Sequence, residues 1–393
     1  MPPSPSARQP KLKKGILQFL NVSEAVGAGK DKEAAVAAIS AAVDSWSGTG
    51  EELEAAMQHA GLAATRCRTP AEWRATEQGK LVAALSPVDV HPTFESVEGT
   101  GTERAPAARE AERGDDVADG PWRRLKDGAP RPLSDVIVLD FSHVIASPMV
   151  GRTLAEHGAL VLKIVTQKRP RRALFDEETN NGKHVLELDL DSAADRARLH
   201  ALMGGADILV DGYTDGVLAR HGFGEEALRQ QYPDLIRVRV SYYGHVGPLR
   251  GAKGFQQNAN FATGVATVDD EANLGYQLVS QVDYATGYLG ALGAVLALTD
   301  RQKLATASAA ARRLQEGERR GAIVRASLCQ TATWMAKFGA RMPSRAEYVW
   351  RVTRLLFGLG DKLRHEAGLT YLPPDESLQM SHTPPARLTG FNR

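Results

Sequence analysis

Asp283 is the one residue in the segment QVDYATGYLGALGAVLAL (281–298) whose side chain carries a charge. A dry, ionised carboxylate that faces a cleft can act as the nucleophile of an acyl transfer. The N-terminal end of a helix favours the ionised form, because the helix dipole places partial positive charge there. The same position also suits a helix N-cap, in which the carboxylate accepts the backbone N–H of Ala285 or Thr286. The residues alone leave both interpretations open.

The segment that positions Asp283 has the pattern of a buried helix. Bulky side chains recur at spacings of three and four and predict one packing face. Glycines between them would let a neighbouring backbone approach closely. The predicted packing face carries Tyr284, Tyr288, Leu292 and Val295, and the glycines are Gly287, Gly290 and Gly293.

From Leu133 onward, strand and helix patterns alternate. Repeated β-α-β units predict an α/β fold with an open, mostly parallel sheet and helices on both faces. Ligands of such sheets bind at the carboxyl ends of the strands. The predicted strands are residues 136–141, 160–165, 184–190, 206–213 and 235–243, and the helices between them include PMVGRTLAEHGA, DSAADRARLHALM and EEALRQQY.

The first third of the chain is predicted to be mainly helical. Helical periodicity runs through residues 32–59, and Gly61 would end the second helix of this stretch. Thr69 and Pro70 suit the N-cap and first turn of a helix over 71–85. From about residue 92 to 130, Pro, Gly, Glu, Arg and Ala predominate without periodicity, which predicts a disordered linker.

Composition narrows the class of protein. The 48 basic and 47 acidic residues give a formal net charge of +1, so no overall field favours nucleic acid or an anionic membrane. The longest apolar run, 287–298, is too short and too rich in glycine to span a bilayer, and the N-terminus has no secretory signal. We therefore expect a cytoplasmic protein that binds neither nucleic acid nor membrane, with a mitochondrial location as the alternative.

Metal and nucleotide motifs are weak in this sequence. Cys67 and Cys329 form neither a disulfide framework nor a thiol-rich metal pattern. The isolated histidines lack the i, i+4 pairing of a metal-binding helix, so we expect no metal site. The first strand is followed by SHVIASPMVGR, and neither a dinucleotide-binding glycine motif nor a P-loop occurs in the sequence.

Five blocks of sequence, in order, resemble the class III CoA-transferases, the CaiB/BaiF family. PLSDVIVLDFSHVIASPMVGRTLAEHGALVLKI resembles the family's opening strand, its "AGP" turn and its "LGADVIKVE" strand. NNGKHVLELDL, YTDGVLARHGFG and SYYGHVGPLRGAKGF resemble its "NRGKRSVALDL", "FRPGVLERLGLG" and "GFGQTGPYRDRPGYD" blocks. QVDYATGYLGALGAVLAL resembles the segment that carries the catalytic aspartate, and Asp283 stands at that place. The resemblance covers residues 131–335 and is more specific than any single block.

The resemblance implies a transferase that moves coenzyme A from an acyl-CoA donor to a carboxylic acid acceptor. Asp283 would form a mixed anhydride and then a CoA-thioester intermediate, with the CoA thioester as substrate and no permanently bound cofactor. A non-catalytic CoA-thioester-binding or partner subunit is one alternative, and an acyl-CoA isomerase or racemase is another. Phe255 stands where the racemase branch has its catalytic histidine, which disfavours racemisation.

The same resemblance implies the residues that contact CoA. The turn after the first strand would approach CoA with its backbone, although Ser147 replaces the glycine of "AGP". Cations would lie near the nucleotide, and each of them has a solvated surface charge as its alternative interpretation. Thr214 and Asp215 replace the arginine and proline of "RPGVL", and fewer cations should weaken CoA binding. The implied contacts are Val144, Ile145 and Ala146 in the turn, the cations Lys183, Arg220 and Lys253, and Tyr213 and His221 around the adenine or its ribose.

The N-terminal part resembles the family's small domain, which follows the catalytic aspartate in ordinary members. ELEAAMQHAGLAATRCRTPAEWRATEQGKLVAAL carries this likeness. A small-domain-like segment that precedes the catalytic region resembles permuted or tandem members of the family. The resemblance implies a chain that is shortened at its N-terminus and lacks the family's glycine-rich loop. It also implies a homodimer. The predicted regions are a disordered arm (1–13), a small α+β domain-like segment (14–91), a linker (92–130), a Rossmann-like CoA-binding catalytic domain (131–340) and a C-terminal helix with an extended tail (341–393).

Overall fold

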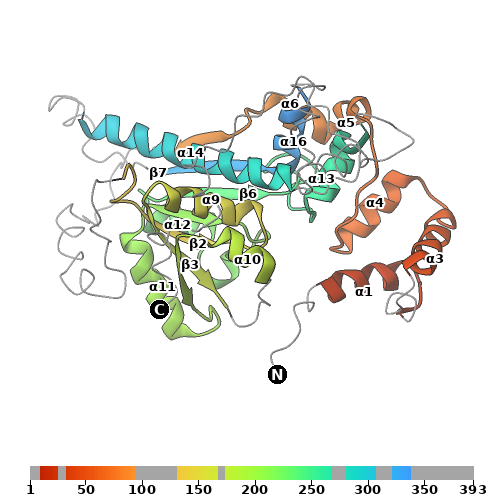
Figure 1. The fold of residues 1–393 in the computed structure, drawn as a ribbon, viewed down its shortest axis with the longest axis horizontal. Helices are drawn as coiled ribbons and strands as arrows, with labels where there is room; N and C mark the ends of the chain where they lie inside the picture. Colours follow the sequence, from red (N-terminus) through yellow and green to blue (C-terminus); the bar gives the residue numbers. More distant parts are fainter. Residues whose placement is uncertain are drawn as a thin grey trace, which may run out of the picture.

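A seven-stranded sheet forms the centre of the described structure (Figure 1). The computed structural model describes residues 9–24, 32–93, 131–166, 173–267, 280–306 and 321–337. The strand order is β1-β7-β6-β5-β2-β3-β4, in which β2 to β7 run parallel and β1 pairs antiparallel with β7 at one edge. The predicted α/β class and mostly parallel sheet are confirmed.

The five predicted strands are all present, and three of them are shorter at their carboxyl ends than predicted. The residues beyond these ends leave the strand pairing, although Leu188, Tyr242 and Tyr243 among them stay buried in the core. The sequence analysis predicted neither β1 nor β7. The strands are β1 (Asp89–Thr93), β2 (Ile137–Phe141), β3 (Leu160–Val165), β4 (Lys183–Glu187), β5 (Ile208–Asp211), β6 (Ile236–Ser241) and β7 (Gly321–Ser327).

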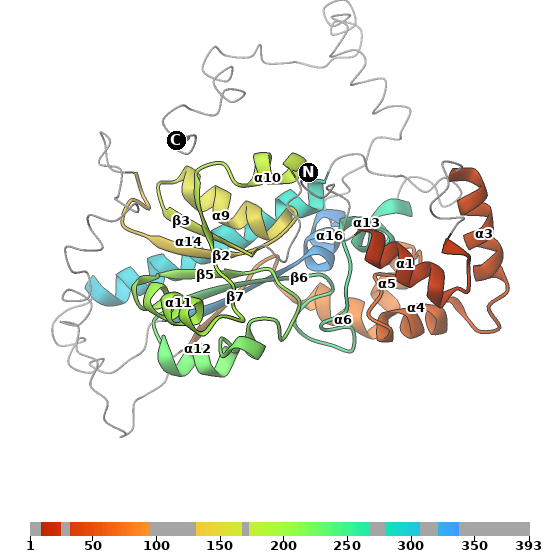
Figure 2. The same cartoon turned by 90° about the horizontal axis from the view of Figure 1, so that it is seen from below.

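Helices cover both faces of the sheet, as predicted (Figure 2). Side chains alternate along each strand, so Val138 of β2 packs toward one face and Leu139 toward the other. The first face is covered by α9 and α14, and the second by α11 and α12. The bounds are α9 (Ala146–Glu156), α10 (Ala173–Thr179), α11 (Ala193–Gly205), α12 (Glu225–Gln231) and α14 (Gln281–Thr306).

Glycines place α14 directly on its neighbours. A Cβ atom at Gly287 would lie 2.7 Å from the carbonyl oxygen of Ala146, and one at Gly290 would lie 2.9 Å from Val150 Cγ2. The predicted role of the glycines is therefore confirmed. The predicted packing face is wrong at Tyr288 and Leu292, which are 50% and 48% exposed, whereas Val295 packs against the core as predicted. Small residues form the face of α14 that packs on α9, since they let the two backbones lie closer together than bulky side chains would.

The helix α14 is longer than its apolar run, because it continues through polar residues to Thr306. By length and composition, Gln281–Arg301 is long and apolar enough to cross a membrane. Half of its most apolar window is buried inside the fold, however, and its glycine face packs on α9 and the sheet. In this structure α14 is a core helix.

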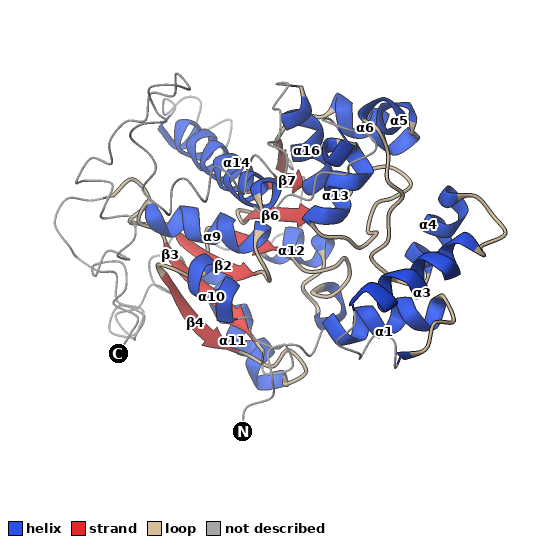
Figure 3. Cartoon of the chain, turned by 45° about the vertical axis from the view of Figure 1, so that its right-hand side comes forward, coloured by secondary structure: helices blue, strands red, loops and turns tan. Residues whose placement is uncertain are grey.

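The N-terminal helices lie to one side of the sheet (Figure 3). Gly61 has a φ of 73° after α4, as its predicted role as a helix end requires, and Thr69 caps α5 as predicted. The predicted helix over 71–85 is divided at Thr76, because the Thr76 side chain accepts the backbone N–H of Gly79 and caps a second helix. The helices are α1 (Gln9–Phe19), α3 (Lys32–Asp44), α4 (Gly50–His59), α5 (Pro70–Ala75) and α6 (Glu77–Ala84), with α13 (Gln256–Thr263) and α16 (Leu328–Ala336) beside them.

The predicted region boundaries are only partly open to comparison. Residues 9–13 of the predicted arm belong to α1, and residues 92 and 93 of the predicted linker belong to β1. The rest of the linker, 94–130, and the predicted C-terminal helix and tail, 341–393, lie outside the described residues. Because β1 completes the edge of the large sheet, the segment 14–91 shares a structural unit with the region that follows it.

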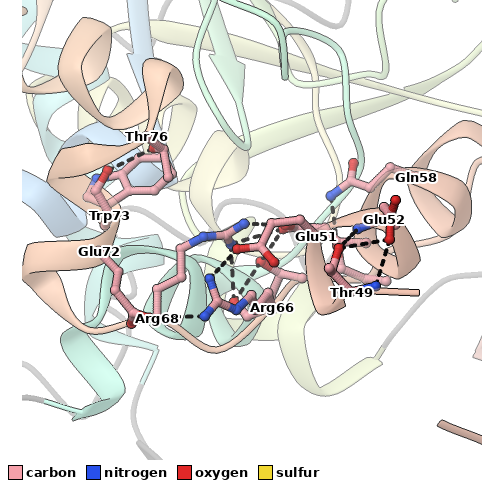
Figure 4. A network of polar contacts seen from close by, with 12 residues as sticks. Thr49, Glu51, Glu52, Gln58, Arg66, Arg68, Glu72, Trp73 and Thr76 are labelled. Carbon is pink, nitrogen blue, oxygen red and sulfur yellow. Dashed lines mark hydrogen bonds and ion pairs between the residues drawn. The ribbon is translucent and has the colours of Figure 1, made fainter. Parts of the chain in front are cut away.

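Buried polar contacts fasten this N-terminal segment to the sheet. Glu54 of α4 and Arg68 are 6% and 5% exposed and form an ion pair. The hydroxyl of Tyr243, after β6, donates to Glu54 Oε1 at 2.8 Å. Nearby, Arg66 pairs with Glu51 of α4 and lies 3.0 Å from Glu72 of α5 (Figure 4). The Arg68 guanidinium and the Tyr243 hydroxyl together satisfy the Glu54 carboxylate, and these contacts join the N-terminal segment to the chain after β6.

Candidate functional site

Asp283 lies in the first turn of α14, which begins two residues earlier at Gln281. The N-cap interpretation is therefore wrong. Its backbone N–H donates to Oε1 of Gln256, the buried first residue of α13, at 2.9 Å. Within the described residues, no hydrogen bond or ion pair reaches the Asp283 carboxylate.

Burial raises the pKa of Asp283 from 3.8 to about 7. The sequence analysis expected the helix N-terminus to favour the ionised form, but the loss of water around the carboxylate outweighs that effect. Both protonation states are therefore populated near neutral pH. A carboxylate held in this state is typical of functional sites, because a stable fold gains nothing from it.

The N-terminal ends of α14 and α9 lie together. Gly287 touches the first turn of α9 at Ala146, and Gly290, further along α14, touches Val150, so the two helices run parallel. Asp283 and Gly287 are four residues apart and share a helix face. This arrangement places Asp283 beside the loop that leads from β2 into α9. Two helix N-termini also concentrate partial positive charge at this edge of the sheet.

The loop between β2 and α9 contains a strained residue. Val144 has a φ of 72°, in the left-handed region that β-branched residues avoid. Ile145 and Ala146 follow it and are 5% and 9% exposed. Ser147, the departure from "AGP", turns into the fold against Gly212. Strained backbone of this kind persists where the surrounding structure holds it, often at ligand sites.

Lys183 is buried inside the fold, contrary to its expected place as a cation near the nucleotide. It is 1% exposed, and its Nζ donates to Asp140 Oδ2 at 2.7 Å and to the Pro148 carbonyl at 2.6 Å. Burial is the largest influence on Lys183 and lowers its pKa to about 8, with Lys163 acting in the same direction against Asp140. An ammonium engaged on two sides in this way is not displayed to a ligand.

The remaining predicted contacts lie in loops after the strands. Tyr213 follows β5 and packs edge-on against Phe141, with ring centroids 6.0 Å apart. Arg220 is exposed and His221 half-buried in a short 3-10 helix, where His221 Nδ1 lies 3.8 Å from Asp191 Oδ1. Lys253 is exposed, and its Nζ donates to the Gly61 carbonyl at 3.3 Å. The structure thus places Asp283 one helical turn before Gly287, which contacts Ala146 of the turn, and among the described residues it shows no contact of Asp283 with these four side chains.

The sequence analysis missed Gln256, Asp140 and Lys163. Gln256 left little signal, because it is one of two adjacent glutamines just after the fourth of the five matching blocks. Asp140 and Lys163 were recognisable, since each is a charged residue within an otherwise apolar predicted strand, VIVLDF or LVLKIV. A charge in a buried strand requires a partner of opposite charge.

Comparisons with known proteins bear on the class to which the chain belongs. The family model described as CoA-transferase family III matches residues 133–351, more than half of the chain. The chain is similar to an acetyl-coenzyme A transferase of Hypoxylon pulicicidum, with 33% identity over 180 residues, 44% of this chain and 30% of that protein. It is also similar to an acyl-CoA transferase of Gibberella moniliformis, with 27% identity over 306 residues, 74% of this chain and 50% of that protein.

The chain spans half the length or less of these two curated relatives. Among solved structures, a Mycobacterium tuberculosis protein, Rv3272, superposes with a TM-score of 0.47 at 23% identity. That superposition covers 54% of this chain and 59% of the other.

Proposed function

The chain belongs to CoA-transferase family III, and from this premise we propose that it moves coenzyme A from an acyl-CoA donor to a carboxylic acid acceptor, with Asp283 as the nucleophile. The observation that carries the proposal is the isolation of Asp283. Its carboxylate has no cation beside it among the described residues, and burial raises its pKa to about 7. Such a group keeps its lone pairs for a reacting carbonyl.

The proposed reaction divides one transfer into steps that each exchange a single acyl bond. The Asp283 carboxylate attacks the thioester carbonyl, which forms a mixed anhydride and releases CoA thiolate. The thiolate attacks the aspartyl carbonyl, which releases the donor acid and leaves CoA joined to Asp283 as a thioester. The acceptor carboxylate then attacks this thioester, which forms a mixed anhydride of the acceptor with Asp283 and releases CoA thiolate. The thiolate attacks the acceptor carbonyl of this anhydride, which gives the acceptor acyl-CoA and regenerates the Asp283 carboxylate.

Two features of the site support these steps. Thiolates, carboxylates and the phosphates of CoA are anions, and the paired N-terminal ends of α9 and α14 favour anions in front of them. The anhydride must be kept from water, and the burial that raises the pKa of Asp283 supports this requirement. The cations for the CoA phosphates remain part of the proposal, with exposed Arg220 and Lys253 as candidates in place of buried Lys183.

A substitution at Asp283 tests the proposal. Purified protein is incubated with acetyl-CoA, succinyl-CoA or palmitoyl-CoA and pooled carboxylic acids, and new acyl-CoA species are detected by mass spectrometry. Asp283→Ala should lower the transfer rate by about 10³-fold or more, because the variant lacks the proposed nucleophile. Asp300→Asn is the matched control, since Asp300 is an exposed acid near the other end of the same helix. Unchanged transfer in Asp283→Ala would refute the proposed nucleophile.

A homodimer is also part of the proposal. Tyr288, Leu292 and Leu296 are 50%, 48% and 45% exposed and form one apolar stripe on α14, which supports an interface there. Light scattering should give twice the mass of the chain, and Leu292→Glu should shift the protein toward the monomer. A monomeric wild-type protein at micromolar concentration would contradict this part.

A further inference from the structure

Three charged side chains meet beneath α9. Asp140 of β2 and Lys163 of β3 are opposite each other in the sheet, and Lys183 reaches them from β4. The exposed fractions of Asp140, Lys163 and Lys183 are 0%, 4% and 1%. A Cβ atom at Gly151 of α9 would lie 2.6 Å from Asp140 Oδ2, so α9 fits over this cluster because residue 151 is a glycine. The fold therefore makes room for charges that a purely apolar core would exclude.

Each lysine of this cluster holds one end of the strained loop. Lys163 Nζ donates to the carbonyl of Ser142 at 2.8 Å and to its hydroxyl at 2.6 Å, before Val144. Lys183 Nζ donates to the carbonyl of Pro148 at 2.6 Å, after Ala146. Both ammonium groups share Asp140, with Nζ to carboxylate distances of 2.7 Å for Lys183 and 3.9 Å for Lys163. The three side chains thus clamp the loop at its entry and at its exit.

We propose that Asp140, Lys163 and Lys183 are positioning residues that hold the 144–146 turn in the strained conformation that receives the CoA thioester. The part of this inference that concerns CoA rests on the proposed function. Val144 adopts its φ of 72° against its own preference, so some other part of the structure must hold it there. The clamp supplies hydrogen bonds on both sides of Val144, and the turn lies beside Asp283. Lys183 then acts on CoA binding through the turn rather than by touching the phosphates.

Lys183→Met is the first test, because it leaves Asp140 facing Lys163 and so leaves no unmatched charge. Deuterium exchange should be about tenfold faster at the backbone amides of residues 143–147, while α11 and α12 exchange as in the wild type. Calorimetric titration with CoA should give a dissociation constant about tenfold higher, because fewer molecules hold the competent turn. Arg301→Met is the control, since Arg301 pairs with Asp207 at the amino ends of the strands, 2.9 Å apart, and should change neither quantity.

Val144→Gly separates a positioning role from a general loss of stability. Glycine populates the left-handed region readily, so the turn needs the clamp less. In a Val144→Gly background, Lys183→Met should raise the CoA dissociation constant by less than about threefold. An equal tenfold effect in both backgrounds would overturn the inference. Ser142→Ala removes only the hydroxyl contact of Lys163 and serves if Lys183→Met does not fold, with the same expectations at smaller size.

The deuterium-exchange and CoA-binding measurements together distinguish a failure of the proposed function from a failure of the proposed clamp. If wild-type protein does not bind CoA, the proposed function fails, and the exchange rates of residues 143–147 still decide whether the clamp holds the turn. If wild-type protein binds CoA but folded Lys183→Met matches it in both binding and exchange, the clamp is wrong and the proposed function stands.

Discussion

Asp140, near the carboxyl end of β2, and Asp283, in the first turn of α14, are two carboxylates with opposite surroundings. Asp140 is fully buried and has two lysines beside it, at 2.7 Å and 3.9 Å. Asp283 has no cation beside it among the described residues, and burial raises its pKa to about 7. A matched buried charge builds structure, whereas an unmatched one costs stability and stays available for chemistry.

The cost at Asp283 depends on pH in a defined direction. Below pH 3.8 the carboxyl is protonated in both the folded and unfolded states, so it costs nothing. As pH rises toward 7, the unfolded chain ionises first, and the free energy of unfolding falls. Above about pH 7 the full penalty is present, on the order of 2–4 kcal/mol.

The largest expected effect comes from removing the matched charge. Asp140→Asn should lower the free energy of unfolding by about 3–5 kcal/mol, because it leaves two buried ammonium groups without a counterion. Urea denaturation followed by circular dichroism measures the change. The exposed Asp300→Asn should differ from the wild type by less than about 0.5 kcal/mol. If Asp140→Asn is as stable as the wild type, the matched charge of Asp140 does not stabilise the fold, and its contrast with Asp283 is wrong.

The same substitution at Asp283 should have the opposite sign. Asp283→Asn removes a half-buried charge that has no cation beside it among the described residues, and it should raise the free energy of unfolding at pH 8 by about 2–4 kcal/mol. The gain should shrink toward zero as the pH is lowered to 4, where Asp283 is protonated in the folded protein. Denaturation curves at pH 4, 6 and 8 test this trend. A destabilised Asp283→Asn at pH 8 would show that the carboxylate has a partner that stabilises it.

The pH dependence of transfer should report the same carboxylate. If the ionised form is the nucleophile, as proposed, kcat/KM should rise about tenfold per pH unit below pH 7 and level off above it. Gln256→Glu places a second carboxylate next to Asp283 and should move the midpoint to higher pH. Initial rates between pH 5 and 9 give both profiles. A midpoint of the kcat/KM profile below pH 5 would mean that a partner stabilises the ionised Asp283 carboxylate.

The smallest expected effect concerns the strained turn. Val144→Gly should raise the free energy of unfolding by about 1 kcal/mol, because glycine accepts a φ of 72° without strain. Val185→Gly is the matched control, since Val185 lies within β4 and is 49% exposed, and glycine should destabilise a strand there. Thermal unfolding of the two variants should shift in opposite directions. A loss of stability in Val144→Gly would mean that its side-chain packing outweighs the strain.

The sequence predicted the features that depend on neighbouring residues and missed the contacts between residues that are far apart in the chain. Apolar runs between turn residues predicted β2 and β3, and the glycines of α14 predicted that a neighbouring backbone approaches this helix closely. The burial of Lys183 was not predictable from its own neighbourhood, because its partner Asp140 lies 43 residues earlier on another strand. For the same reason β1 was missed, since five residues become a strand only where β7, more than 200 residues later, offers an edge.

The choice of helix face was wrong for a different physical reason. Periodicity marked Tyr288 and Leu292 as packing residues, yet hydrophobicity alone does not say which face meets a neighbour. Close approach of two helices requires small residues, so the glycine face of α14 lies on α9 and the bulky face remains exposed. The pKa of Asp283 likewise depends on how much water this packing leaves at the helix end.

Trapping of the acylated enzyme tests most directly that Asp283 is the unmatched carboxylate that performs the chemistry. Wild-type protein is incubated with acetyl-CoA, succinyl-CoA or palmitoyl-CoA, treated with hydroxylamine, and digested for mass spectrometry. We expect a hydroxamate at Asp283, none at Asp300 and none without the acyl-CoA, because hydroxylamine attacks the activated aspartyl carbonyl. Transfer of CoA between acids while Asp283 remains unmodified would contradict the account.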